Sequence, residues 1–343
     1  MNAPVPSPAR EMVGAPRSTV DLLVALGVPT ERHVDLLADT YVLEAIEHLD
    51  RAGIDPRWFA TRCSLLLIKP DAIVARAVQP TLVWLADRGW RVRHAARVPA
   101  DRHLARALWA RSWATASPER RRLADLLVGI CDAMVLVVED DEPPGAGLTP
   151  PARFAPGAES ATERLTREKG PTKPPARKPG QLRYILGRHT YLLNLVHTPD
   201  APIDVLREWA IISDEAARQR CLTDMLRPAD DSDGADESDG AAAALSLVEE
   251  LYRQVPAWRF DRDAALSRIR HDLAGTGIGC ASDDDAACAA LLRTAWASET
   301  PMDPWSVIVL GSHVLPMIGD PQVRAAASAP ITPTTFSTTR RAR

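Results

Sequence analysis

Four short apolar stretches set the strongest constraint on how this chain can fold. They are 63–69, 90–98, 133–140 and 189–196, and each has the length of a strand, with a continuous apolar run or an alternation of apolar and polar residues. Helices are predicted between and after them, over 72–88, 100–113, 118–129 and 203–212. The resulting order, β-α-β-α-α-β-loop-β-α, predicts an α+β fold with a ferredoxin-like split βαβ antiparallel sheet that is covered by helices.

Helical patterns continue beyond this region at both ends of the chain. A short helix can begin at Ser18 or Thr19, and apolar residues recur at helical spacing over 31–52. Further helical patterns follow the central region, at 241–254, 262–274, 285–297 and 304–318. Because these additions are small and amphipathic, we expect them to pack together against the central region.

The other stretches have the composition of connections. Residues 1–17 and the tail 325–343 are predicted to be disordered. Residues 228–240 are acidic and lack large apolar side chains, which predicts a solvated linker. These boundaries divide the chain into an N-terminal helical extension, a central domain and a C-terminal helical region, at 18–59, 60–227 and 241–324. A proline-rich connection, 141–180, precedes the fourth predicted strand.

The composition limits the classes of partner. With 343 residues, 46% of them hydrophobic, the chain can bury a sizeable core. Its net charge of −4 gives no overall attraction to nucleic acid or to a membrane surface, and no stretch has the length of a transmembrane helix. The start of the sequence lacks the apolar segment of a signal peptide. Five scattered cysteines without a CxxC pair favour reduced thiols and no zinc site, so we expect a cytoplasmic protein.

Phosphoryl transfer through a protein nucleophile has definite chemical requirements. Such chemistry needs a nucleophile that attacks phosphorus in line, and cationic or amide donors that take up charge on the transferred oxygens. His197 follows the fourth predicted strand, and Glu208 lies eleven residues later. A neutral imidazole can attack through one nitrogen while a carboxylate holds the proton on the other.

The surrounding residues resemble the nucleoside diphosphate kinase family in four places. Lys69-Pro70-Asp71 ends the first predicted strand. Gly170-Pro171-Thr172, followed by Ala176-Arg177-Lys178-Pro179-Gly180-Gln181-Leu182-Arg183, is similar to the family's G-x-T-N-P…A-x-P-G-T-I-R. Asn194-Leu195-Val196-His197-Thr198-Pro199-Asp200 resembles N-x-x-H-G-S-D, and Glu208 has the family's spacing from the histidine. The resemblance covers about residues 60–215.

This resemblance implies a role for each matching residue. His197 would receive the γ-phosphoryl group of a nucleoside triphosphate and pass it to a nucleoside diphosphate or a related acceptor, while Glu208 supports the other ring nitrogen. The remaining roles are those of phosphate ligands, at Lys69, Thr172 and Arg183, and of a ribose contact, at Asn194. Lys69 and Arg183 could instead form ion pairs with Asp71 or Glu208.

The resemblance also implies a cofactor and an assembly. Mg²⁺ would bridge the phosphates of the donor, and Asp200 could hold the ion through water. Capping of the following helix is an equally good interpretation of Asp200. The family forms oligomers, so we expect a homo-oligomer.

Several residues depart from the family pattern. Thr198-Pro199 replaces Gly-Ser, and Thr166 stands at the position of the phosphate-binding arginine. Arg167, one residue further on, is the candidate to bind phosphate in its place. The family's base-stacking phenylalanine has no clear equivalent; Trp109 could stack on a base or only pack against the sheet. Two alternatives therefore stay open. One is a nucleotide-binding module without turnover that engages a protein partner, and the other is a specialised biosynthetic kinase with a non-standard acceptor.

Overall fold

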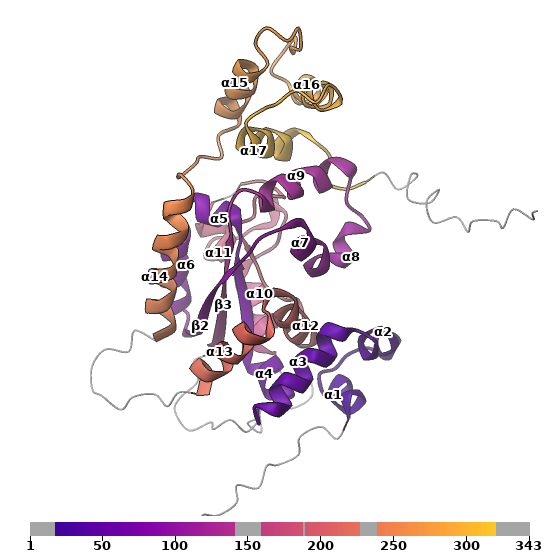
Figure 1. Ribbon diagram of the computed structural model, residues 1–343, viewed down its shortest axis with the longest axis vertical. Helices are drawn as coiled ribbons and strands as arrows, with labels where there is room; N and C mark the ends of the chain where they lie inside the picture. Colours follow the sequence, from indigo (N-terminus) through magenta and orange to yellow (C-terminus); the bar gives the residue numbers. More distant parts are fainter. Residues whose placement is uncertain (1–17, 141–158, 188, 227–238, 320–343) are drawn as a thin grey trace, which may run out of the picture.

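The computed structural model describes residues 18–140, 159–187, 189–226 and 239–319, and a four-stranded sheet forms its centre (Figure 1). The strands are β1 (Cys63–Ile68), β2 (Trp90–Val98), β3 (Ala133–Asp140) and β4 (Val196–His197). They lie in the order β2-β3-β1-β4, and each neighbouring pair is antiparallel. This order is that of a ferredoxin-like sheet, so the predicted fold class is confirmed. The predicted disordered ends and most of the acidic linker lie outside the described residues.

The fourth strand is much shorter than predicted. Only Val196 and His197 pair with β1, and the preceding residues 189–195 form an irregular loop. The loop has its own hydrogen bonds, such as that from the Leu193 amide to Thr190 Oγ1, at 3.1 Å. Leu195 has a left-handed φ of 67°, which ends the extended conformation. The apolar run was wrongly interpreted as a strand because its leucines are buried from a loop.

Alternating side chains of the sheet supply two separate hydrophobic cores. On β1, Leu66 and Ile68 belong to one core, while Leu65 and Leu67 belong to the other. A strand points successive side chains to opposite faces, so the sheet itself divides the cores. All four side chains are at most 3% exposed. Both faces must therefore be covered by helices.

The core that contains Leu66 and Ile68 is formed with helices that follow β1 and with the C-terminal helices. They are α5 (Pro70–Val74), α6 (Val78–Ala86), α9 (Pro118–Val128), α10 (Ala161–Lys169), α11 (Leu182–Ile185), α14 (Asp239–Gln254), α15 (Arg262–Asp272), α16 (Asp285–Ala297) and α17 (Pro304–Val314). Within this group α14 lies along β2, whereas α15, α16 and α17 form a cap over α9 at one end of the molecule (Figure 1).

The core that contains Leu65 and Leu67 is formed with the N-terminal helices, the helix that follows β2 and the two helices that follow β4. They are α1 (Thr19–Ala25), α2 (His33–Leu37), α3 (Thr40–Arg51), α4 (Pro56–Arg62), α7 (Arg102–Leu108), α12 (Pro202–Ile212) and α13 (Glu215–Leu226). The helix α8 (Ala110–Trp113) and two 3-10 turns, η1 (Thr30–Arg32) and η2 (Pro174–Ala176), complete the elements.

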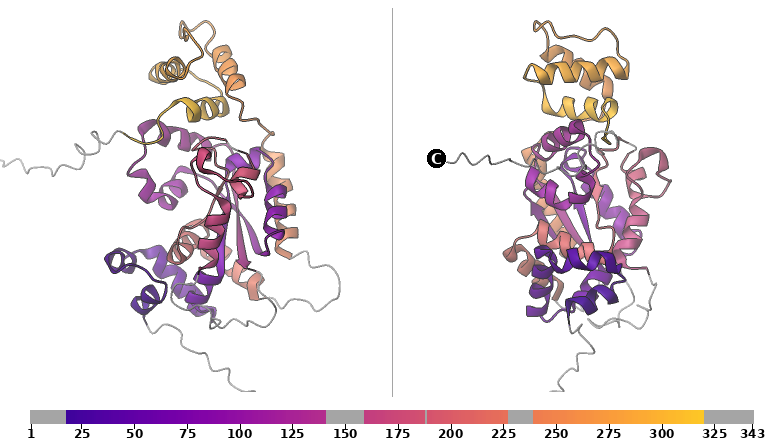
Figure 2. Two further views of the ribbon diagram at one scale, coloured as in Figure 1. Left: turned by 180° about the vertical axis from the view of Figure 1, so that it is seen from behind. Right: turned by 90° about the vertical axis from the view of Figure 1, so that its right-hand side faces the viewer.

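The additions at the two ends of the chain do not pack together, contrary to expectation. The N-terminal helices join the core that contains Leu65, and the C-terminal helices join the core that contains Leu66. In Figure 2 the helices α15, α16 and α17 lie at the end of the molecule opposite the N-terminal helices, while α14 lies along the sheet. The two groups therefore belong to the two different cores that the sheet separates.

Three predicted helices are each broken by a specific residue. The stretch 72–88 is interrupted at Arg76, which has a φ of 59°, and 31–52 is interrupted at Asp39, whose carboxylate caps α3. The stretch 100–113 is interrupted at Trp109, which ends α7 and precedes α8. No helix among the described residues is both long and apolar enough to cross a membrane.

Candidate functional site

His197 and Glu208 form a hydrogen-bonded pair between β4 and α12. His197 is the last residue of β4, and the chain then turns into α12, which begins at Pro202 and presents Glu208 from its second turn. His197 Nε2 lies 2.9 Å from Glu208 Oε2. The predicted pairing across eleven residues is therefore present in the structure.

The other nitrogen of the histidine faces Trp109. The indole Nε1 donates to His197 Nδ1 at 3.2 Å, and the two rings meet edge to face, with centroids 5.5 Å apart. An indole nitrogen can only donate, so Nδ1 must be the unprotonated nitrogen. The proton then lies on Nε2 and is donated to Glu208. These two contacts fix one tautomer, with the lone pair on Nδ1.

The surroundings keep this imidazole neutral. Burial lowers the pKa of His197 well below its usual value, and the charges of Lys169, Arg183 and Lys69 lower it further, against the opposing effect of Asp200. Burial also raises the pKa of Glu208 well above its ordinary value, assisted by Asp204 and Asp200. A neutral imidazole keeps its lone pair available for attack.

Lys69 lies in the site but has an internal partner. It precedes α5 at the end of β1, is buried, and its Nζ lies 3.3 Å from Asp71 Oδ2 and 3.1 Å from the carbonyl of Leu192. Burial lowers the pKa of Lys69, and Asp71 opposes that shift. The alternative ion pair with Asp71 is thus present, and it fixes the lysine beside the loop before β4.

Arg183 connects the segment after α10 with the segment that leads into β4. Its guanidinium donates to Thr172 Oγ1 at 3.3 Å and to Asn194 Oδ1 at 3.3 Å, and also to the carbonyls of Gly170 and Val196. The group is buried and has no carboxylate partner among the described residues. Burial lowers the pKa of Arg183 to about 10. Thr172, Arg183 and Asn194, which the sequence placed in the site, therefore lie together.

Lys169 lies in the site, although the family resemblance assigns it no role and its sequence context allowed either an anion-attracting flap with Lys173, Arg177 and Lys178 or a solvated charge run. It is the last residue of α10, is 4% exposed, and its Nζ donates to Thr198 Oγ1, next to His197. Thr166, one turn earlier, also bonds to Thr198, at 2.7 Å. Residues three apart share a helix face. The signal in the sequence was that Lys169 lies on the same face as Thr166, where the arginine was expected.

Arg167 does not reach the site. Its side chain is 60% exposed and forms a bidentate ion pair with Glu159, at 2.9 Å for both bonds. Arg167 and Lys169 are two positions apart, about 200° around a helix, so they point to opposite sides. The prediction that Arg167 binds phosphate is therefore corrected, because the phase of α10 turns it away.

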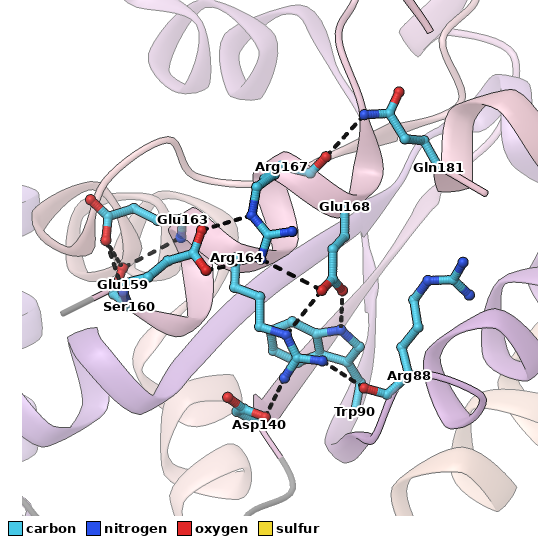
Figure 3. Close-up of polar contacts among 10 residues, drawn as sticks. All are labelled: Arg88, Trp90, Asp140, Glu159, Ser160, Glu163, Arg164, Arg167, Glu168 and Gln181. Atoms are coloured by element: carbon cyan, nitrogen blue, oxygen red, sulfur yellow. Dashed lines mark hydrogen bonds and ion pairs between the residues drawn. The ribbon is translucent and has the colours of Figure 1, made fainter. Parts of the chain in front are cut away.

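Arg164 holds α10 against the sheet and fixes that phase (Figure 3). Its guanidinium donates to Asp140, to Glu168 and to the carbonyl of Arg88, and lies 4.6 Å from the centre of the Trp90 ring. Trp90 in turn donates to Glu168 at 3.1 Å. Three kinds of contact on one side chain leave α10 little freedom to rotate.

Asp200 is exposed between β4 and α12, and its negative charge acts to raise the pKa values of His197, Lys169 and Arg183. It does not cap α12, whose N-cap is Ala201 without a side-chain bond. Among the described residues, no group of three or more histidines, cysteines or carboxylates is arranged to hold a metal. Mg²⁺ commonly takes one or two carboxylates plus waters and substrate phosphates, so Asp200 is the carboxylate of this site that would hold such an ion.

Comparisons with known proteins return nucleoside diphosphate kinases among solved structures. The enzyme from Aquifex aeolicus is 18% identical, with a TM-score of 0.36, over 46% of this chain and 98% of its own. That from Pyrobaculum aerophilum is 17% identical (TM-score 0.35), over 46% and 98%. That from Borrelia burgdorferi, with bound vanadate and ADP, is 17% identical (TM-score 0.36), over 46% and 89%. No family model and no curated protein matches the sequence.

Proposed function

We propose that this chain is a phosphotransferase that carries a phosphoryl group on His197. One observation supports the proposal above all others. The unprotonated Nδ1 of a partly buried neutral histidine lies in the field of two buried cations, Lys169 and Arg183, neither of which has a carboxylate partner among the described residues. A nucleophile next to uncompensated positive charge suits an anionic electrophile such as phosphate.

The reaction would proceed in two displacements. In the first, the Nδ1 lone pair attacks the γ-phosphorus of a nucleoside triphosphate, the Nδ1–P bond forms, the bond to the bridging oxygen breaks, and the diphosphate leaves. In the second, an oxygen of the acceptor attacks phosphorus and the N–P bond breaks. The proton on Nε2 stays in its hydrogen bond to Glu208 throughout. Glu208 stabilises the positive charge that the ring gains in the phosphorylated state.

The neighbouring residues would bind and orient the donor. Arg183, with Thr172, would bind phosphate oxygens, and Asn194 would contact the sugar. Lys69 would contribute positive charge from the end of β1, and its ion pair with Asp71 partly neutralises that charge. Asp200 would hold Mg²⁺ through water, and that ion would neutralise phosphate charge when it is bound.

Trp109 must leave Nδ1 before attack can occur. Its indole nitrogen lies 3.2 Å from Nδ1, which is the space that phosphorus would take. Trp109 lies at the junction of α7 and α8, where the helix is interrupted. A small movement of this junction would open the histidine to a substrate.

The test is incubation of the protein with γ-³²P-labelled ATP and Mg²⁺. We expect label that is stable in base and labile in acid, as phosphohistidine is, and no label on His197→Ala. Transfer of the label to added nucleoside diphosphates then identifies the acceptor. Absence of label on the wild-type protein, or equal label on His197→Ala, would refute the proposal.

The contact between the Trp109 indole and His197 Nδ1 also favours a second candidate function. A module that binds nucleotide without turnover could retain an indole on Nδ1 permanently. Calorimetry that detects nucleotide binding, combined with no phosphohistidine in the wild type or in Trp109→Phe, would support this candidate. If label forms but does not pass to nucleoside diphosphates, a screen of other hydroxyl and phosphate acceptors would test a specialised kinase.

A further inference from the structure

Lys169 is a buried cation without an anionic partner. Only 4% of the residue is exposed, and among the described residues no carboxylate lies within 4 Å of its Nζ. Its recorded hydrogen bond is to a neutral group, the hydroxyl of Thr198. The other buried lysine, Lys69, has Asp71 at 3.3 Å. An ammonium group has three protons to donate, so one hydroxyl leaves it incompletely satisfied.

Such an arrangement costs folding free energy. Burial lowers the pKa of Lys169 to about 7, with a further contribution from Arg183, while Asp200 and Glu208 act in the opposite direction. A buried charge without a partner is unfavourable, and a lysine that served only packing could be replaced by an apolar side chain of similar length. The cost is therefore understandable if an anion occupies the site during function.

The position of Lys169 indicates where that anion would lie. Thr162, Thr166 and Lys169 occupy one face of α10, at spacings of four and three residues. The two threonines bond to the carbonyl of Pro199, at 2.8 Å and 3.0 Å, so this face is fixed against the segment that follows His197. Lys169 lies at the end of the face, directly before the segment Gly170 to Thr172, which contacts Arg183.

We propose that Lys169 binds an oxygen of the phosphoryl group that is transferred to His197, and that Thr198 is only its resting partner. This inference rests on the proposed function of the same site. Arg183 and Lys169 approach from α11 and α10, so the two cations would bind the phosphoryl group from two different elements. Lys169 then takes the charge role for which Arg167 had been predicted.

The proposal distinguishes the transferred phosphate from the rest of the nucleotide. Calorimetry would compare the β,γ-imido analogue of ATP with ADP, each with Mg²⁺, on wild type, Lys169→Met and Lys169→Arg. We expect Lys169→Met to bind the analogue about 30-fold more weakly and ADP less than threefold more weakly, because a charge-assisted hydrogen bond to the third phosphate is lost. Lys169→Arg should restore most of the difference. Lys178→Met, at an exposed lysine, serves as the control.

Two outcomes would overturn the assignment. One is analogue affinity in Lys169→Met within threefold of wild type, and the other is an equal loss for the analogue and for ADP. Because this is a binding measurement, it remains informative if His197 is never phosphorylated, which would refute the proposed function alone. Thermal unfolding of Lys169→Met should occur at the wild-type temperature or above, since a buried charge has been removed, and so a loss of binding would not reflect unfolding.

Discussion

The two nitrogens of His197 have different environments, and the difference decides its chemistry. Glu208 accepts the proton of Nε2 at 2.9 Å, and the Trp109 indole donates to Nδ1 at 3.2 Å. Only the neutral ring can accept the indole N–H, whereas burial and the nearby cations Lys169 and Arg183 lower the pKa of His197. The indole contact also covers the nucleophilic nitrogen, so the same residue that selects the tautomer must move away for reaction.

Trp109→Phe should raise the pKa of His197. Phenylalanine keeps an aromatic ring but has no N–H group, so the neutral imidazole loses a hydrogen bond that its protonated form cannot accept. Titration of the ring proton signals of His197 by NMR measures this change. An unchanged or lower pKa would show that the indole does not select the tautomer, and Trp113→Phe is the matched control.

Affinity for the β,γ-imido analogue should fall as pH rises from 7 to 9. Lys169 in the free protein has a pKa of about 7, and a bound anion raises that pKa. The protonated form of Lys169 therefore binds the analogue best, and this form becomes rarer in the free protein as the pH rises above 7. The limit is about tenfold per pH unit. The charged groups that influence Lys169 are Arg183, Asp200, Glu208 and His197, and the pKa of His197 is lowered out of this range. Calorimetry at pH 7, 8 and 9 tests the slope; a slope equally steep in Lys169→Arg would contradict the prediction.

At the scale of elements, α12 is positioned by the N-terminal helices. Arg207 on α12 donates to Asp39 at 2.6 Å, and Arg32 lies 3.3 Å from Asp204. Beneath these surface pairs, the Phe59 ring of α4 packs on Trp209, with centroids 4.8 Å apart. Trp209 follows Glu208 directly, so packing between α4 and α12 determines where Glu208 points. The N-terminal extension thus contributes to the site without supplying a residue that contacts His197.

Phe59→Ala should lower the free energy of unfolding by about 3–5 kcal/mol, because the side chain is fully buried and its removal leaves a cavity against α12. Urea unfolding followed by circular dichroism measures the change. Val34→Ala, at a residue that is 77% exposed, should change stability by less than about 0.5 kcal/mol. Equal effects of the two substitutions would show that α4 does not support α12.

For the whole molecule, the sheet organises two cores that are closed by opposite ends of the chain. The C-terminal helix α14 lies against β2, next to the irregular pairing between Val92 and His94. Gly240 allows this close approach, because a Cβ there would lie 2.3 Å from the carbonyl oxygen of Val92. The C-terminal addition is therefore part of the folded core and not an independent appendage.

Gly240→Ala should destabilise the protein by about 1–3 kcal/mol, since the added methyl group forces α14 away from the backbone of β2. Gly279→Ala is the control, because nothing lies within 4 Å of a Cβ at that position. The thermal unfolding temperature of both variants measures the effect. Stability of Gly240→Ala equal to that of the control would mean that α14 does not contact β2 so closely.

The sequence alone predicts the order of strands and helices along the chain. Its motifs predict several residues of the site, among them His197 and Glu208. Hydrophobic periodicity is a local property, so β1, β2, β3 and the helices α9, α12, α14, α15, α16 and α17 could be predicted within a few residues of their ends. The spacing of His197 and Glu208 is also local, because a fixed turn into α12 brings them together. The irregular loop 189–195 could not be predicted, since apolar residues buried from a loop have the same pattern as a buried strand.

Packing between distant segments determines which cation enters the site and which nitrogen of His197 carries the lone pair. The sequence favoured Arg167, which is one residue from the expected arginine, whereas the rotation of α10 that Arg164 fixes through Asp140 and Trp90 directs Lys169 into the site. The contact of Trp109 with Nδ1 joins elements 88 residues apart. These facts depend on packing between distant segments, and no local pattern carries that information.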